Sequence, residues 1–503
     1  MSEDSEAFAT LAERAAAIPP WIFLKYAAQI IGLIDGSAGF FAVRVLEHVA
    51  KKYPKALYYP FRVTYPSLSD NGKRLVMRLG HLLQDDLCDR FVEALGGLTH
   101  PELRYADGLK QVKELIRQKK MAEAESLYSD VLASCTDTEW PLVGTKIGTY
   151  NARFARFMSK KIGKGGDQRG SSQRKSTAGL TQKSVDEMLM FARDLSGSGG
   201  DGWTLRFTSG KIPLAEFSEW LIDLGSLLLT LSSQQYSVAG STGKESYIEI
   251  PGQYVLDCDR EPIVEEHSRI LSVHNQLLAI ASIRRPKRVC FLGSSGEECF
   301  YLVKGGEDLR NDERIEQLFV LMNSIVRNVS VKGANDTQRS TAGGGRPRLR
   351  ARTFAVIPLS QKLGILEWVK DTVPLKSVIS EEMARDAEFV EKNPRCVQSA
   401  RQRSVDLSGI IASEERLKWL KGKHDCASYH DMIQKAKPES AQKLWRKMVR
   451  TIPDDFLRRR FMAISSSAEI FLTLRSECAR SLAVSSIFGY ILGIGMLCAV
   501  IFC

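Results

Sequence analysis

The stretch Val303–Phe319, VKGGEDLRNDERIEQLF, decides how the rest of the chain is interpreted. The residues that lead into it alternate and are rich in β-formers, which predicts a strand that ends at two glycines. After the glycines, apolar residues recur at the spacing of a helix: Ile315, Leu318, Phe319, Met322, Ile325 and Val326. The pattern predicts a strand, a glycine turn and an amphipathic helix, in that order.

Lys304 lies at the end of the predicted strand, and acidic residues enter the helix that follows. This order is typical of a kinase small lobe, in which a strand lysine steadies nucleotide phosphates and a helix carboxylate holds the lysine in place. Glu307 and Asp312 are the candidate carboxylates, and the sequence does not choose between them. The alternative interpretation is an ordinary surface turn, because Lys-Gly-Gly is common in turns.

A family resemblance rests on several segments that occur in the same order along the chain. Besides KGGEDLR and DERIEQLF, these are IPGQY (Ile250–Tyr254), SIRRPKR (Ser282–Arg288), LGILEWV (Leu363–Val369), GKHD (Gly422–Asp425) and AEIFLTLRS (Ala468–Ser476). Together they resemble the PI3-kinase-like protein kinases. The paired glycines before Glu-Asp-Leu-Arg favour the DNA-dependent branch of that family.

The resemblance implies an α+β fold: a helical FAT-type solenoid followed by a bilobal PI3/PI4-kinase-like domain with an incomplete large lobe. In that fold Lys304 contacts a phosphate of ATP, with Glu307 or Asp312 as its partner. The segment LGILEWV becomes the hinge that frames adenine, and its residues in that role are Leu366, Glu367, Trp368 and Val369. Without the resemblance, Trp368 is an ordinary core aromatic.

Two positions inside the match depart from many relatives. Asn311 stands where many have Gln, and Phe354 stands where many have Tyr, so one hydroxyl of the pocket is missing. Neither change is expected to prevent nucleotide binding. A hairpin is predicted around GSSGEE (Gly293–Glu298), and its turn is where we expect the loop that covers the phosphates. The turn lacks GxGxxG, as do the resembling kinases.

The expected domain division follows composition and resemblance. It assigns residues 1–158 to the helical end of the FAT region, 159–246 to a basic Gly/Ser loop and FRB-like helices, 247–372 to the small lobe and hinge, 373–495 to the start of the large lobe, and 496–503 to a divergent tail.

Within the first part, apolar residues between Pro19 and Leu132 are spaced for helices. The three prolines of residues 53–66 are expected to interrupt them. The basic loop 159–179 is interpreted as a solvated linker, with contacts to phosphates as the alternative.

Composition narrows the class of protein. With 503 residues the chain can hold roughly three domains, and its 44% hydrophobic content is ample for buried cores. The excess of Lys and Arg over acids, 70 against 59, suits acidic partners such as nucleic acid without requiring them. Ten cysteines without a CxxC pair argue for reduced, intracellular thiols and against a zinc module. The start, MSEDSEAF, lacks the apolar core of a secretory signal.

The family match ends in mid-motif. Relatives continue from the position of Gly495 into a catalytic loop with Asp, His and Asn, and later Asp-Phe-Gly, whereas this sequence continues MLCAVIFC (Met496–Cys503). We therefore expect no catalytic residue and no metal ligand of the family here, although the intact family uses Mg²⁺. This interpretation makes the chain a truncated and inactive product of an early stop or an imperfect gene prediction.

A membrane anchor is the other interpretation of this end. From Ser481 to Cys503 there are 23 residues in a row without a charge. Such a run is long enough to cross a hydrocarbon core of about 30 Å. Arg475 and Arg480 precede it, as a cytosolic flank would.

The function implied by the resemblance is that of a DNA-dependent protein kinase-like enzyme, which transfers phosphate from ATP to Ser/Thr of proteins. Such an enzyme is nuclear, is recruited to DNA ends by the Ku heterodimer and acts in non-homologous end joining. The alternatives are a non-catalytic adaptor, a tail-anchored membrane protein and a lipid kinase of the related group. SIRRPKR and KGGEDLR weigh against the lipid kinase.

Overall fold

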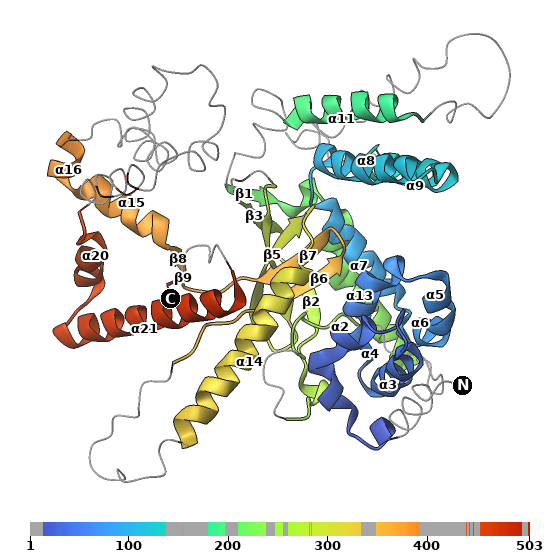
Figure 1. The fold of residues 1–503 in the computed structure, drawn as a ribbon, viewed down its shortest axis with the longest axis horizontal. Helices are drawn as coiled ribbons and strands as arrows, with labels where there is room; N and C mark the ends of the chain where they lie inside the picture. The colour runs from blue at the N-terminus through green and yellow to red at the C-terminus, as the bar shows by residue number, and fades with distance from the viewer. Residues whose placement is uncertain are drawn as a thin grey trace. The chain divides into compact units, whose positions relative to one another are not determined.

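A computed structural model gives the fold of the chain (Figure 1). It describes residues 14–136, 154, 180–196, 210–237, 247–254, 260–280, 282, 284–332, 349–392, 439, 442, 446, 453–494 and 501–502. The chain divides into two compact units: Met1–Val320 with Thr353–Val369, and Leu321–Arg352 with Lys370–Cys503. Helices and a sheet are both present, so the predicted α+β class is confirmed. The basic loop 159–179 and the segment GKHD lie outside the described residues.

The first unit begins with helices. They are η1 (Pro20–Tyr26), α2 (Ala27–Ile31), α3 (Gly39–Lys52), α4 (Pro54–Thr64), η2 (Tyr65–Ser67), α5 (Asp70–Leu75), α6 (Met77–Leu83), α7 (Asp86–Gly97), α8 (Pro101–Arg117), α9 (Met121–Thr136) and α11 (Gln182–Ser196). Buried apolar residues recur every three or four positions, as Leu46 and Val49 do on α3. The helical pattern predicted from Pro19 onward is therefore confirmed.

The prolines of residues 53–66 interrupt the helices at two of three positions: α3 ends before Pro54, and α4 ends before Pro66. The prediction is wrong only for Pro60. Pro54 occupies the first position of α4, where the missing N–H would have had no helical partner. Pro60 lies inside the helix, and Thr64 Oγ1 donates a hydrogen bond to its carbonyl at 3.0 Å. Burial of the neighbouring Leu57 in the helical core offsets the lost backbone hydrogen bond.

An antiparallel sheet of seven strands follows in the same unit. The strands are β1 (Gly210–Pro213), β2 (Ile270–Val273), β3 (Gln276–Ala279), β4 (Lys287–Gly293), β5 (Glu298–Gly305), β6 (Val356–Ser360) and β7 (Leu363–Glu367). Their order is β1-β3-β4-β5-β7-β6, with β2 paired to β4. The helices η3 (Leu214–Glu216), α13 (Glu219–Ser237), η4 (Val264–Glu266) and α14 (Arg310–Lys332) lie between strands in the sequence.

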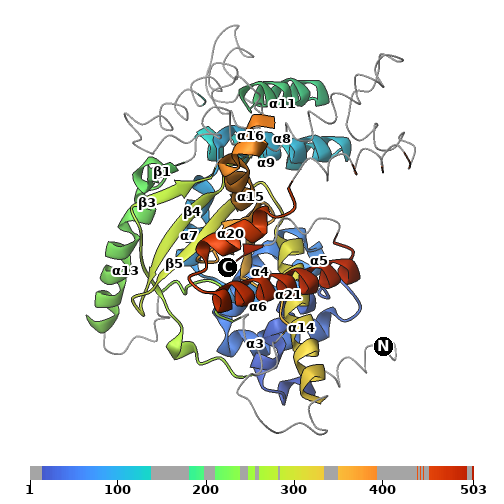
Figure 2. The ribbon, with the colours of Figure 1, turned by 90° about the vertical axis from the view of Figure 1, so that its left-hand side faces the viewer.

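One face of this sheet packs against helices. Figure 2 shows β3, β4 and β5 in front of α7, with α13 beside them. The Phe91 ring of α7 and the Phe291 ring of β4 have centroids 5.6 Å apart. Tyr301 and Val303 of β5 are buried in the same core. The helical segment and the sheet thus share one hydrophobic core. The opposite face of the sheet bears Lys304, whose side chain is partly exposed.

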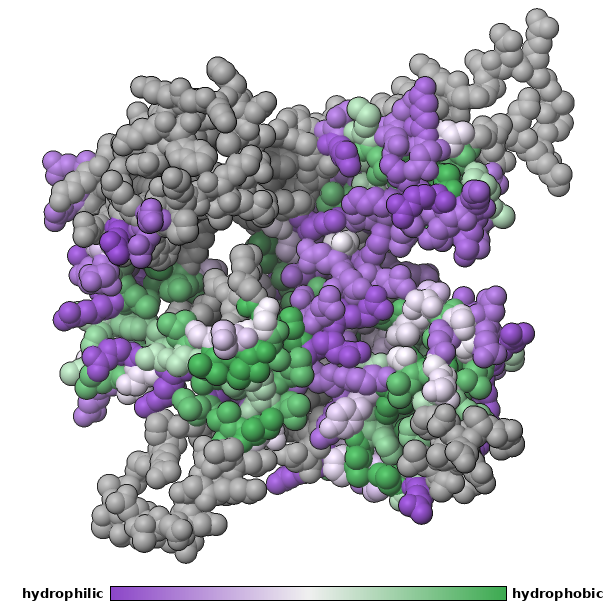
Figure 3. Space-filling model, in the orientation of Figure 1, coloured by the Kyte–Doolittle hydropathy of each residue, from purple (hydrophilic) through white to green (hydrophobic). Residues whose placement is uncertain are grey.

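The second unit contains α15 (Leu375–Arg385), α16 (Ala387–Lys392), α20 (Phe456–Ile464), α21 (Ala468–Leu492) and the short strands β8 (Val373–Pro374) and β9 (Ile501–Phe502), which pair. Ser467 caps α21 by accepting a hydrogen bond from Ile470 N, and Gly493 ends it at φ 67°. Hydrophobic surface lies over α21 in Figure 3. In the part of the chain that the structure describes, no helix is long and apolar enough to span a membrane.

Candidate nucleotide-binding site

The candidate site begins on β5, whose side chains alternate between two faces. Tyr301 and Val303 point into the core, so Phe300, Leu302 and Lys304 lie on the other face. Lys304 pairs in register with Gly364 of β7, and no side chain at that position crowds the lysine. The side chain of Lys304 is 27% exposed. An amine on an open sheet face is therefore accessible to an anion.

Lys304 has an acidic neighbour across the glycine turn. Gly306 has φ 78°, which turns the chain back so that Glu307 faces the lysine. The distance from Lys304 Nζ to Glu307 Oε2 is 3.6 Å, an ion pair too long for a hydrogen bond. Asp312 lies in the first turn of α14. Of the two acids that the sequence left open, Glu307 is the one that the structure pairs with Lys304.

The predicted hinge residues continue from β7. Leu366 pairs with Leu302 of β5 and with Val356 of β6, which places it on the Lys304 face. The Glu367 N–H donates a hydrogen bond to Ala355 O at 2.8 Å. The strand LGILE is thus part of the sheet.

Trp368 follows directly, and its N–H donates to Phe300 O at 2.8 Å. The N–H groups of Glu367 and Trp368 are therefore engaged within the sheet. Val369 is buried at the end of this segment. A ligand that packs on Trp368 would meet its ring rather than its N–H.

An arginine that sequence reasoning did not single out lies beside this ring. Arg288 of β4 pairs in register with Leu302, so its side chain shares the face of Lys304. Its Cζ lies 5.2 Å from the centroid of the Trp368 ring and 5.1 Å from that of Phe300. These are cation–π distances. The strand register brings Arg288 here, and no spacing in SIRRPKR indicates it.

The turn GSSGEE is not next to Lys304, so the predicted position of the phosphate-covering loop is wrong. Leu292 pairs with Glu298 beside that turn, whereas Lys304 stands at the other end of β5. The connection between β3 and β4, residues 280–286, lies at the Lys304 end, because Lys287 pairs with Val303. SIRRPKR, not GSSGEE, therefore contributes the loop beside the lysine.

This second loop is tied down by an ion pair. Arg284 Nη1 lies 2.7 Å from Oδ2 of the buried Asp107, which comes from α8. A Cβ added at Gly306 would collide with the Arg284 guanidinium, so the two loops touch. Arg285 in the same loop has φ 45°, a backbone conformation that a side chain other than glycine rarely adopts.

Lys362 is a third cation at the edge of the sheet that bears Lys304 and Arg284. Lys362, in the turn before β7, donates from Nζ to Asp107 O at 2.7 Å, and its carbonyl accepts the Gly306 N–H at 2.6 Å. Burial lowers the pKa of Lys362 from its ordinary value. Lys304, Arg284 and Lys362 thus surround the glycine turn, a charge arrangement that suits phosphate.

The Mg²⁺ site that the family resemblance implies is not assembled in the part of the chain that the structure describes. Among these residues, no group of three or more His, Cys, Asp and Glu side chains could hold a metal ion. The described residues therefore do not fit the metal, and no reaction step is assigned through it.

Comparison with known proteins relates the chain to kinases. The family model for phosphatidylinositol 3- and 4-kinase matches residues 298–495. The chain is 29% identical over 492 residues to the DNA-dependent protein kinase catalytic subunit of Dictyostelium discoideum, covering 96% of this chain and 10% of that protein. It is 27% identical over 507 residues to the same protein of Canis lupus familiaris, covering 97% of this chain and 11% of that protein.

Another relative matches a shorter part of the chain. The chain is 31% identical over 268 residues to serine/threonine-protein kinase TOR of Arabidopsis thaliana, covering 53% of this chain and 9% of that protein. Residues 298–495 are thus similar to the kinase domain of the phosphatidylinositol 3- and 4-kinase class. Over nearly its whole length the chain is similar to PI3-kinase-like protein kinases. It spans about a tenth of the length of the DNA-dependent relatives that it matches.

Proposed function

We propose that this chain binds ATP on the open face of its sheet and provides the nucleotide-holding part of a PI3-kinase-like protein kinase. The main observation behind this proposal is the Lys304–Glu307 ion pair, which lies on the sheet face where Arg288 contacts the Trp368 ring. Lys304, with Arg284 and Lys362 nearby, would hold the phosphates. The segment Leu366–Val369 would frame adenine, with the Trp368 ring packed on it. Asp312, in the first turn of α14, would be a second acid near the phosphates.

The cellular role proposed is that of the DNA-dependent branch. The support is that relatives with that name match nearly the whole chain, whereas the TOR relative matches about half of it. The intact protein would then phosphorylate Ser/Thr of proteins in the nucleus, at DNA ends bound by Ku, during non-homologous end joining. The domain division given above, with a FAT region and an FRB-like segment before the small lobe, is part of the same proposal.

We further propose that the 503-residue polypeptide, assayed alone, does not transfer phosphate. Phosphoryl transfer needs an acid that orients the nucleophile and metal ions between phosphate oxygens. The positions after Gly495 hold Met496, Cys498 and Ile501 where the resembling family places such groups. None of these side chains is a ligand for a hard metal ion.

The test is transfer of labelled phosphate from ATP to a Ser-Gln peptide, with and without Ku and DNA ends. The expected result is no transfer above background, because positioning and charge stabilisation provide most of the acceleration. ATP binding is measured in the same samples, and Lys304→Ala is expected to weaken it. Transfer that disappears in Lys304→Ala would overturn the proposed inactivity. Binding that is unchanged in this variant would overturn the proposed site.

A further inference from the structure

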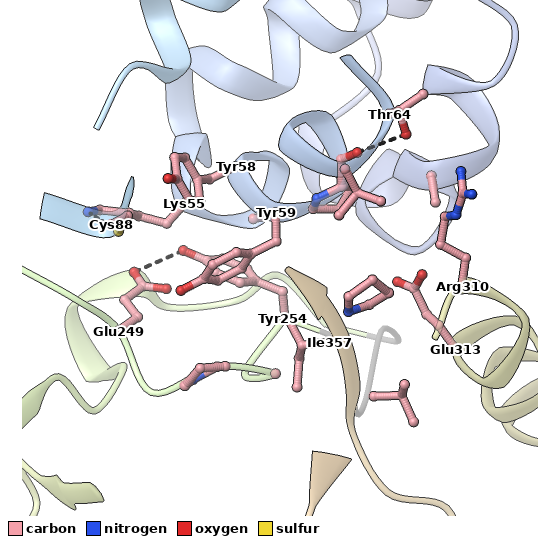
Figure 4. Close-up of a pocket in the computed structure, with 18 of the residues that line it drawn as sticks. Lys55, Tyr58, Tyr59, Thr64, Cys88, Glu249, Tyr254, Arg310, Glu313 and Ile357 are labelled. Carbon is pink, nitrogen blue, oxygen red and sulfur yellow. Dashed lines mark hydrogen bonds between the residues drawn. The ribbon is translucent and has the colours of Figure 1, made fainter. Parts of the chain in front are cut away.

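A cavity lies in the first unit, between the helical segment and the small lobe (Figure 4). Its volume is about 220 Å³. The helices α2 and α4 form one side of it, and the segment 247–254, strand β6 and the start of α14 form the other. Neither Lys304 nor any hinge residue is among the residues that line it. It is therefore a different site from the one proposed for nucleotide.

The walls of the cavity are apolar and aromatic. Tyr58 and Tyr59 come from α4, and Tyr254 comes from the segment IPGQY. The lining also includes small or apolar residues: Ala28, Gly32, Ala56, Val63, Ile250, Val356 and Ile357. A dry engineered cavity of about 150 Å³ holds a benzene ring. A cavity of this size and lining therefore accommodates one aromatic ring or a small fused pair.

Most polar groups of the lining are already satisfied. Glu249 accepts a hydrogen bond from the Tyr254 hydroxyl at 3.0 Å, as Figure 4 shows. Lys55 Nζ donates to Tyr247 O at 2.7 Å and pairs with Asp85. Arg310 is turned to Asp308, with a distance of 2.6 Å between Nη2 and Oδ2. None of these groups needs a ligand.

Glu313 differs from them. It lies on α14 across the cavity from Glu249 and Tyr254 (Figure 4). Among the described residues, its carboxyl makes no hydrogen bond and no ion pair within 4 Å. Burial raises the pKa of Glu313 to about 7, and the nearby Arg314 acts in the opposite direction. A ligand with a donor at this end would give the carboxylate a hydrogen-bond partner.

We propose that this cavity is a binding site for an aromatic amidine or amine of one or two rings. The ring packs between Tyr59, Tyr254 and Ile357, and the N–H groups donate to the Glu313 carboxylate. Tyrosine faces also attract a delocalised cation, which favours a charged amidine over a neutral amide of the same shape. The opposing walls come from α4 and from β6 with α14, so a bound ligand joins the helical segment to the small lobe.

The test is calorimetric titration of the 503-residue chain with benzamidine, in mildly alkaline buffer where Glu313 is ionised. Benzamide is the neutral probe of the same shape. Glu313→Gln keeps the size of the side chain and removes the charge. Glu266→Gln changes an exposed glutamate outside the lining and serves as the matched control. Ala28→Leu extends a lining side chain into the cavity, so it tests the location independently of charge.

The expected result is binding of benzamidine that weakens about tenfold or more in Glu313→Gln, because a hydrogen bond to a charged group is lost. Binding should be weaker for benzamide, reduced in Ala28→Leu, unchanged in Glu266→Gln and unaffected by saturating ATP. Absence of binding at millimolar benzamidine overturns the proposal. Binding that survives both cavity variants, or that ATP displaces, places the compound elsewhere and overturns it equally.

Discussion

Lys287 and Lys304 show how differently one residue type is used on neighbouring strands. Lys304 is on the open face of the sheet, whereas Lys287 is on the core face and is only 2% exposed. Lys287 Nζ lies 5.1 Å from the Phe217 ring centroid and has no hydrogen-bond partner among the described residues. Burial, together with the nearby charge of Arg285, lowers the pKa of Lys287 to about 7. Lys287 thus weakens the fold at neutral pH.

We predict that Lys287→Met stabilises the chain at neutral pH by about 1–3 kcal/mol, since an unpaired buried charge is replaced by a side chain of similar length. The unfolded chain holds the lysine proton up to its ordinary pKa of 10.5, whereas the folded chain releases it near 7. Between these values the unfolded state binds more protons, so wild-type stability rises with pH and the advantage of Lys287→Met shrinks.

Urea unfolding at several pH values measures this effect. Lys211→Met, which changes an exposed lysine of β1, is the matched control and should show no such trend. A Lys287→Met chain that is less stable than the wild type throughout the range would contradict the assignment.

At the scale of residues, the sequence predicted the lysine of the candidate nucleotide site and its acidic partner. It did not predict all the cations around them. Lys304 was found because the strand, the glycines and the acids adjoin in sequence, and Glu307 is within one turn of it. Arg288 and Lys362 were missed, because only strand pairing brings them to the same face or edge. Spacing along one chain does not report pairing between strands.

At the scale of elements, the turn after β5 is the most constrained part of the site. Gly306 has φ 78°, and a Cβ there would approach Asp107 Oδ2 to 2.6 Å and collide with Arg284. Gly296 has a similar φ of 82° but no atom within 4 Å of an added Cβ. A side chain at either glycine would therefore carry the free-energy cost of a positive φ. Only at Gly306 would it also collide with neighbouring side chains.

We predict that Gly296→Ala destabilises the chain by about 1 kcal/mol, the cost of a positive φ. Gly306→Ala should cost at least about 1 kcal/mol more and should also weaken ATP binding, because the ion-paired side chains of Arg284 and Asp107 must shift. Thermal unfolding and ATP titration of both variants measure this. Equal losses in the two variants would show that the contact with Arg284 does not matter.

The elements themselves were predictable where pattern and packing agree. The alternation before Gly305 and the apolar stripe after it gave β5 and α14 correctly. Only Pro60 of α4 was misjudged, because proline counts against a helix locally, whereas burial of Leu57 outweighs that loss. The phosphate-covering loop was assigned to the wrong turn for a different reason. Which loop adjoins Lys304 depends on the pairing of β4 with β5, and the sequence does not report that pairing.

At the scale of the whole molecule, the second unit exposes much apolar surface on α21. Tyr490 is 87% exposed and Ile491 is 64% exposed, and Ile487 is exposed as well. Apolar surface of this kind favours association with other apolar surfaces. The described part of α21 therefore predicts a chain that is prone to self-association.

We predict that replacing Ile487 and Ile491 together by Ser lowers the fluorescence of a bound apolar dye and delays aggregation on heating. The matched control is Leu229→Ser on α13, a leucine of the first unit that is 72% exposed. Light scattering and dye titration measure the difference. An equal effect of the control would mean that α21 is not the associating surface.

The central claim is that Lys304 holds the phosphates and Trp368 holds the base of one nucleotide. The most direct measurement is the affinity of the chain for ATP and for adenosine, determined side by side for the wild type and for Lys304→Ala, Trp368→Ala and Lys211→Ala. We predict that Lys304→Ala weakens ATP binding about tenfold or more and leaves adenosine binding unchanged. Trp368→Ala should weaken both, and Lys211→Ala neither. Equal ATP affinity in Lys304→Ala and Lys211→Ala would contradict the account.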